Sequence, residues 1–117
     1  MNGNPTDSQK RFHQWCVEEV GCVVNKGDDA SLHHIKGSKL KLKGCKKPGE
    51  WYVLPLSYWW HQDGNNKAAR HINKKLFELE SGATEKMHWI ELMHLYAEIN
   101  GCLPMVEEEY YIILNRA

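Results

Sequence analysis

Three features are absent from this chain, and each absence excludes a class of protein. No apolar run approaches the roughly 20 residues that a helix needs to cross a bilayer. The first residues are polar where a secretory signal would be hydrophobic. Paired Cys-x-x-Cys knuckles, which mark many structural zinc sites, are also missing. We therefore expect a cytoplasmic protein with no membrane association.

The cysteines that are present stand singly, and a reducing compartment would leave them as thiols. They are Cys16, Cys22, Cys45 and Cys102. The first three could still form a structural metal site, although buried free thiols are the more ordinary arrangement. A chain of 117 residues with five tryptophans is expected to form one domain with a sizeable core. We place this domain at residues 6–117 and expect disorder only in residues 1–5.

Charge is distributed unevenly along the chain, although the formal net charge is zero. Residues 1–75 carry 13 Lys and Arg against 7 Asp and Glu, whereas residues 76–117 carry 2 against 8. A basic half is suited to a polyanion, and an acidic half can face away from it or dock on a basic partner. The neutral total therefore hides two halves with different partners.

The most informative segment is Leu32-His33-His34-Ile35, which is followed at once by a series of lysines. One imidazole can hold a metal ion while the other takes a proton from water, and the lysines attract a polyanion to both. This combination suits the hydrolysis of a phosphodiester. Two ordinary explanations stay open, because strand neighbours point to opposite faces and lysines commonly protect an edge strand. The lysines are Lys36, Lys39, Lys41, Lys43, Lys46 and Lys47.

Apolar spacing, caps and turn residues predict an α+β fold. The expected strands are residues 31–35 and 51–56, which can form an antiparallel hairpin, together with a strand-like stretch at 22–24. The expected helices are residues 6–20, 57–61, about 68–80, 84–99 and 106–115. The helix at 84–99 has an apolar stripe of Met87, Ile90, Leu92, Met93 and Tyr96. A basic loop at residues 36–50 has only Leu40 and Leu42 as buried side chains.

Several further histidines and aromatic residues have ordinary explanations. His13, His88 and His94 lie on expected helices, where a structural role is the usual one. Of Trp59 and Trp60, we expect one to lie in the core and the other to be partly exposed, where it could stack on a base.

The order of these features is a histidine pair on a strand, a basic loop, a second strand, and a helix bearing His61 and then His71. This order resembles the ββα-metal arrangement of the HNH endonucleases, and specifically the phage and prophage relatives of Ref, the RecA-dependent nuclease. The resemblance covers residues 22–117. It is carried by Cys22-Val23-Val24, Leu32-His33-His34-Ile35-Lys36-Gly37, Pro48-Gly49-Glu50-Trp51, Pro55-Leu56-Ser57, His61, His71-Ile72-Asn73 and Phe77-Glu78.

The resemblance implies a small HNH-type core with flanking helices. It also implies a metal-dependent DNA endonuclease of phage recombination, with RecA filaments as a partner. In such sites the second residue of the pair is the general base and the first is a metal ligand. His34 would then be the base, and His33, His61 and His71 would hold a divalent ion, either zinc or magnesium or manganese. The six lysines would contact DNA phosphates without reading the sequence.

Two departures from the family pattern bear on the site. The helical histidines of related nucleases lie one turn apart, whereas ten residues separate His61 from His71. The loop at residues 63–67 must therefore fold back for both to reach one metal. The asparagine that orients the loop carrying the base has no counterpart in residues 50–56. Asp63 and Asn73 are further candidates for the metal shell.

Two other functions stay open. The histidines could close a structural zinc site in a non-catalytic DNA- or protein-binding module, which a set of four protein ligands would favour because hydrolysis needs a vacant coordination position. The chain could instead be a recombination accessory that acts through RecA, with its acidic half docked on a partner.

Overall fold

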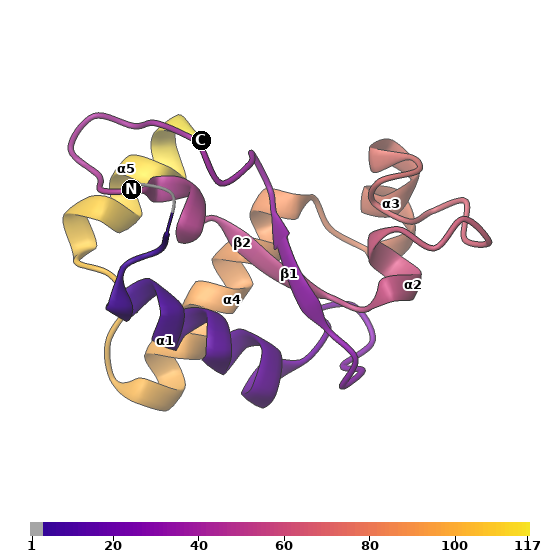
Figure 1. Ribbon diagram of the computed structural model, residues 1–117, viewed down its shortest axis with the longest axis horizontal. Helices are drawn as coiled ribbons and strands as arrows, with labels where there is room; N and C mark the ends of the chain where they lie inside the picture. The colour runs from indigo at the N-terminus through magenta and orange to yellow at the C-terminus, as the bar shows by residue number, and fades with distance from the viewer. Residues whose placement is uncertain (1–3) are drawn as a thin grey trace.

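A two-stranded antiparallel hairpin lies at the centre of the fold, as the computed structural model shows for residues 4–117 (Figure 1). Its strands are β1 (Ser31–His34) and β2 (Val53–Leu56), with Ser31 opposite Leu56 and His34 opposite Val53. Every residue of β2 is buried, because helices cover the strand. The expected hairpin and its long connection are confirmed. Most of the expected disordered stretch, residues 1–5, lies outside the described residues.

Helices surround the hairpin and complete an α+β fold, as the sequence predicts. They are α1 (Asp7–Trp15), the π-helix η1 (Cys16–Val20), the 3-10 turn η2 (Pro48–Glu50), α2 (Tyr58–His61), α3 (Lys74–Ser81), α4 (Glu85–Asn100) and α5 (Glu107–Arg116). In Figure 1, α1 and most of α4 lie to the left of the hairpin, and α2 and α3 lie to its right. In the described part of the chain, no helix is both long and apolar enough to cross a bilayer.

The first helical segment begins and ends where the sequence predicts. Thr6 forms a capping box with Gln9, which satisfies two backbone donors at the start of α1. Gly21 ends the segment with φ +74°, and a Cβ at this position would lie 2.6 Å from the carbonyl oxygen of Gly27. Only glycine fits this turn, because it combines a positive φ with close backbone contact.

Aromatic side chains dominate the core that supports the hairpin. Trp89 of α4 is fully buried, stacks on Tyr110 of α5 and donates a 2.8 Å hydrogen bond to the carbonyl oxygen of Trp51. Phe12 of α1 also packs against Trp51, with ring centroids 5.6 Å apart. Truncating such a side chain typically costs about 3–5 kcal/mol of stability. These contacts hold the start of β2, and through it the strand β1, in a fixed position.

The expected strand-like stretch at residues 22–24 is wrong, because this segment forms a turn. The N–H of Lys26 donates to the carbonyl oxygen of Cys22, which closes the turn. Val23 donates a backbone hydrogen bond to Pro55, but no ladder continues from it. The small apolar side chains of this stretch are explained by contact with the core rather than by a third strand.

Two expectations about the later helices are also corrected. The helix expected to resume at about residue 68 begins at Lys74, because Asn73 caps it by accepting a 3.1 Å hydrogen bond from the N–H of Leu76. On α4, Met87 is 47% exposed, although the apolar stripe placed it in the core. The buried face of α4 instead consists of Glu85, His88, Trp89, Leu92 and Met93. Because the polar residues Glu85 and His88 belong to it, the buried face differs from the one that the apolar residues alone indicate.

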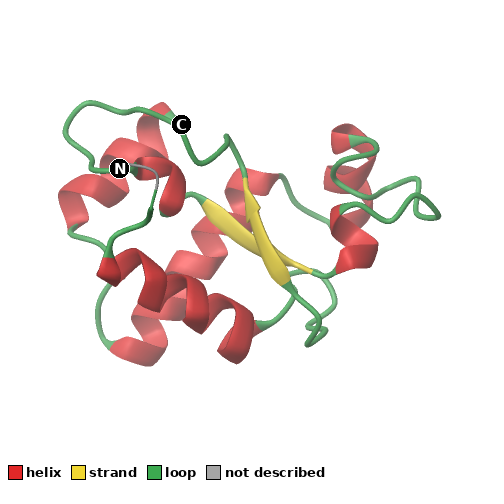
Figure 2. Ribbon diagram, viewed as in Figure 1, coloured by secondary structure: helices red, strands yellow, loops and turns green. Residues whose placement is uncertain are grey.

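The basic loop is confirmed as a long connection without regular strands (Figure 2). Leu40 and Leu42 are only half-buried in it, so the expectation that they are buried is wrong. Of the two neighbouring tryptophans, Trp60 packs against the core and Trp59 is 46% exposed, as expected.

His88 is a buried histidine whose protonation should affect the stability of the fold. The residue is 6% exposed, and its Nε2 lies 2.9 Å from the hydroxyl oxygen of Ser81. Burial lowers the pKa of His88, and the nearby carboxylates of Glu91, Glu78 and Glu85 oppose this only in part.

We expect the free energy of unfolding to decrease as the pH falls below about 6.5, the pKa of an unfolded histidine. In that range the unfolded chain binds a proton that folded His88 does not, which costs at most about 1.4 kcal/mol per pH unit and levels off below the folded pKa. Urea unfolding at about pH 7 and about pH 5, with chelator present, should show a weaker pH dependence for His88→Gln. His94→Gln is the control, because His94 is exposed on the same helix. An unchanged dependence in His88→Gln would contradict this account.

Candidate metal centre and adjoining histidine

Three histidines from different parts of the chain meet beside the hairpin. His33 comes from β1 and is 4% exposed, His61 ends α2, and His71 lies in the turns that precede α3. The expectation that His71 lies on a helix is wrong. The expectation that the chain folds back to bring His71 to His61 is confirmed.

Backbone hydrogen bonds explain how a ten-residue spacing produces this meeting. The N–H of Arg70 donates to the carbonyl oxygen of Trp60 at 2.8 Å, and the N–H of His71 donates to that of His61 at 2.9 Å. The buried side chain of Asn66 ties the intervening loop down, because its amide donates to Trp59 and its oxygen accepts from the N–H of Ala68. The two segments therefore run alongside each other and place the imidazoles together.

The geometry of the three imidazoles fits a single metal ion. One nitrogen from each ring can be chosen so that all three lie within 4.8 Å of one another. The Nε2 atoms of His61 and His71 are 3.0 Å apart. Two nitrogens bound to one tetrahedral zinc ion at about 2.0–2.1 Å would lie roughly 3.3 Å apart. His33, His61 and His71 therefore form a group that could hold a metal ion after small movements of the rings.

Electrostatics keep two of these rings available as ligands. Burial, followed by the neighbouring His33, His71 and Arg70, lowers the pKa of His61 to about 4. Burial, followed by His33 and Arg70, also lowers the pKa of His71. Metal binding requires the neutral imidazole. Both rings are therefore already in the form that binds a metal at neutral pH.

A buried carboxylate lies behind His33. Glu85, at the start of α4, is 2% exposed, and its Oε2 lies 2.6 Å from His33 Nε2 and 2.8 Å from Arg70 Nε. Lys74 Nζ lies 3.9 Å from the other oxygen, Oε1, which is buried and accepts no hydrogen bond among residues 4–117. Burial alone would raise the pKa of Glu85, but the hydrogen bonds from His33 and Arg70 lower it below its usual range. The carboxylate is therefore held in its charged form.

This pairing assigns the two nitrogens of His33. Because Nε2 is engaged with the carboxylate, Nε2–H donates and Nδ1 is the nitrogen left to bind a metal. Carboxylates commonly hold metal-binding histidines in this way and fix both the tautomer and the ring orientation. Sequence reasoning missed Glu85, because an acidic residue just after a Thr84 cap is also ordinary for the first turn of a helix.

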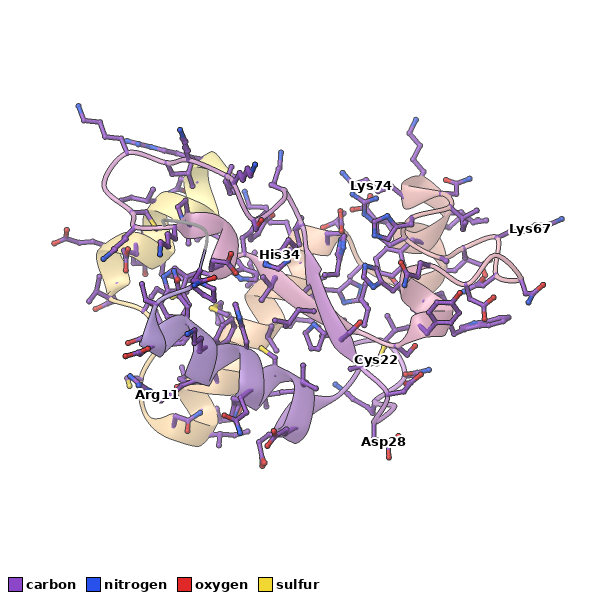
Figure 3. The ribbon with its side chains drawn as sticks, viewed as in Figure 1. Arg11, Cys22, Asp28, His34, Lys67 and Lys74 are labelled. Carbon is purple, nitrogen blue, oxygen red and sulfur yellow. The ribbon has the colours of Figure 1, made fainter. Side chains whose placement is uncertain are left out.

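His34 belongs to a second polar cluster, because neighbouring residues of a strand point in opposite directions. Its Nε2 lies 3.0 Å from Oε1 of Glu50, a side chain that is 7% exposed. His13 Nε2 lies 2.6 Å from the Glu50 carbonyl oxygen, so α1 contacts the same residue. Figure 3 shows His34 on β1, near the middle of the molecule. Sequence reasoning treated His13 as unremarkable and missed Glu50 as a partner of His34.

Other candidates do not join the metal centre. Asp63 accepts a hydrogen bond from the N–H of Asn65, and Asn73 caps α3. Cys16 and Cys22 are buried free thiols, and within residues 4–117 no group of potential ligands includes a cysteine. The open possibility of a cysteine metal site is therefore not supported in that part of the chain.

The six lysines expected to contact DNA lie along the basic loop. Five are exposed and Lys47 is half-buried. Within residues 4–117 none of the six forms an ion pair. The five exposed side chains direct their charge to solvent, whereas the Lys47 ammonium donates a hydrogen bond to the carbonyl oxygen of Asn4.

Comparisons with known proteins give no relative: no family model matches the chain, and no match was found among curated proteins or solved structures.

Replacing any of the three histidines should remove metal binding. We expect wild-type protein to bind one zinc or cobalt ion per chain, and His71→Ala to weaken binding by more than about 100-fold, beyond the loss typical of an outer-shell change. Isothermal titration calorimetry measures both quantities. His94→Ala serves as the control, because that residue is exposed on α4. Equal affinity in His71→Ala and His94→Ala would rule out the proposed ligand set.

Glu85→Gln should weaken metal binding while all three ligands remain. The amide keeps the shape of the side chain but loses the charge that holds Nε2–H of His33. We expect a loss of about 10- to 100-fold in metal affinity. Glu91→Gln on the exposed side of α4 is the control. Circular dichroism should confirm that both variants are folded, and an unchanged affinity in folded Glu85→Gln would contradict the assigned role.

Proposed function

We propose that this protein is a metal-dependent DNA endonuclease that hydrolyses phosphodiester bonds. The observation that carries the proposal is the separation of the adjacent histidines. His33 belongs to a group that could hold a metal, and His34 is held by a different carboxylate. Phosphodiester hydrolysis needs both a positive centre near the phosphate and a base for the attacking water. This pair of residues offers both from a single strand.

His34 would act as the general base. In its neutral form it takes a proton from the water that attacks phosphorus. Its Nε2–H donates to Glu50, so Nδ1 is the nitrogen that accepts the proton. The Glu50 carboxylate orients the ring and stabilises the imidazolium that forms. His13 contacts the backbone of Glu50 and restricts its position.

His33, His61 and His71 would hold the divalent ion, which supplies Lewis-acid stabilisation of the charge that develops on the phosphate. Arg70 lies next to these ligands and is fixed through its Nε by Glu85. We propose that its positive charge also attracts the phosphate. The lysines of the basic loop would hold the DNA backbone without base recognition.

The order of elements supports the proposal that the core is of the HNH type. β1, β2 and α2 follow one another as strand, strand and helix, and they carry His33, His34 and His61. In that arrangement His71 would replace the second helical histidine by way of the turn at residues 66–73. The resemblance also leads us to propose RecA filaments as a partner in recombination.

The number of histidine ligands favours an enzyme over a structural zinc module. Structural zinc sites generally have four protein ligands, whereas catalytic sites keep a position open. Within residues 4–117 the group contains three residues. Three ligands leave a coordination position for water or phosphate.

His34→Ala should abolish nicking of supercoiled plasmid DNA. Removing a general base typically lowers the rate by about 10²- to 10⁴-fold. DNA affinity and metal affinity should stay at wild-type values, because the side chain of His34 pairs with Glu50 and not with a lysine or one of the three histidine ligands. Gel assays with magnesium, manganese or zinc measure nicking, and fluorescence anisotropy measures binding. A His34→Ala protein that still nicked DNA would contradict the assignment of His34 as the general base.

Two further variants sharpen the assay. His94→Ala should nick DNA at the wild-type rate, which controls for loss of a histidine. Glu50→Gln should fall between wild type and His34→Ala in kcat, with little change in KM, because the ring of His34 loses its charged partner but not its place. Equal kcat in Glu50→Gln and wild type would show that the carboxylate does not support the base.

A further inference from the structure

A cavity of about 630 Å³ lies beside the basic loop, and none of the three histidines of the candidate metal centre lines it. Lys39, Lys41, Lys43 and Lys47 line it, together with apolar side chains. Its size is within the range of roughly 300–1,000 Å³ that small-molecule sites occupy. Nothing in the metal centre requires such a cavity.

The apolar side chains that line the cavity explain why leucine alternates with lysine in the basic loop, although the core buries these leucines only in part. Leu40 and Leu42 stand between lysines in the loop and are only half-buried. Both line the cavity, as does the buried ring of Pro48. A polyanion that contacted lysines alone would have no use for these side chains. The lining therefore fits a ligand that combines a flat apolar body with negative charge.

The two ends of the loop that forms the cavity are fixed. A Cβ on Gly49 would overlap the carbonyl oxygen of Gly37, so these two backbone segments are in direct contact. Gln9 of α1 donates its amide to the carbonyl oxygens of Lys46 and Lys47 at 3.2 and 3.0 Å. The cavity is therefore preformed, which lowers the entropic cost of binding.

The cavity also adjoins the proposed general base. Among its lining residues Glu50 is the carboxylate, and the Oε1 atom of this side chain is 3.0 Å from His34 Nε2. With this carboxylate directed to a histidine, the four lysines set the charge of the cavity. A ligand in the cavity would therefore lie next to the strand that carries His34.

We propose that this cavity binds one nucleotide of single-stranded DNA next to the phosphate that is cut. The base rests on Leu40, Leu42 and Pro48, and the flanking phosphates contact the lysines. This inference rests on the proposed function and names its substrate class. A base can enter only when it is unstacked and unpaired, which is costly in a duplex and far less so in a single strand. Single-stranded or locally opened DNA is therefore the preferred substrate.

The test is binding of fluorescent oligonucleotides of about 12 nucleotides to the His34→Ala protein, which does not cut them. A second oligonucleotide of the same length has every base replaced by an abasic site. We expect single-stranded DNA to bind at least tenfold more tightly than duplex, and the fully abasic strand to lose roughly tenfold in affinity, the size of one base contact. Leu42→Ser and Leu40→Ser should remove this difference between normal and abasic strands without changing the salt dependence.

Matched variants separate the base contact from the phosphate contacts. Replacing Lys39, Lys41 and Lys43 by Gln should reduce the salt slope by about 2 units for single strands and leave the weaker binding of the abasic strand measurable. Leu79→Ser should change nothing, because Leu79 is 77% exposed on α3 and does not line the cavity.

Three results would overturn the proposal: equal affinity for single-stranded and duplex DNA, equal affinity for normal and fully abasic single strands, or equally strong competition by an acidic peptide. Wild-type nicking assays separate this failure from that of the nuclease proposal. Nicking without an abasic effect removes the nucleotide site alone, whereas an abasic effect without nicking removes the catalytic role and leaves the nucleotide site.

Discussion

The contact between the Glu85 carboxylate and His33 connects the core of the protein to its candidate metal centre. Glu85 comes from α4, whose buried face supports β2, while His33 comes from β1 and Arg70 from the turn before α3. One buried carboxylate thus joins the hairpin, the main helix and the loop that carries His71. A buried charge without its partners is strongly destabilising, so this contact specifies the arrangement of all three segments. The metal centre depends on it more than on any local sequence pattern.

The strand geometry then explains how two adjacent histidines obtain different environments. Side chains alternate across a strand, so His33 turns toward His61 and His71 while His34 turns toward Glu50 and α1. Each imidazole is held through its Nε2 by its own buried carboxylate. Both therefore leave Nδ1 without a carboxylate partner. In the proposed enzyme, Nδ1 of His33 would bind the metal and Nδ1 of His34 would take the proton, so a single hairpin would supply both groups.

Much of the fold could be predicted from local sequence, because the signals that place these elements are local. Thr6 and Thr84 cap helices, Gly21 and Gly101 end them, and the continuous apolar run before Ser57 forms β2. The start of α3 differs from the expected one, because the turns at residues 66–73 depend on the hydrogen bonds of Asn66 and on backbone pairing with Trp60 and His61. The apolar periodicity of a sequence contains no information about such long-range contacts.

The candidate site divides in the same way. His33, His61 and His71 could be proposed from their order and chemistry, and the structure brings them together. Glu85 and Glu50 could not be identified, because their partners lie 52 and 16 residues away in sequence. Glutamates near helix starts are common, and only tertiary packing shows that these two are buried. Carboxylates that hold histidines are therefore the part of such a site that a single sequence conceals.

The central claim is that three histidines hold one metal ion with a coordination position left open. Anomalous diffraction from crystals grown with zinc or manganese tests it most directly. We predict one ion bound by His33 through Nδ1, by His61 and by His71, with water in the remaining position and with Glu85 still bonded to His33 Nε2. An ion enclosed by four protein ligands, or an ion bound elsewhere while these histidines stay free, would contradict the account.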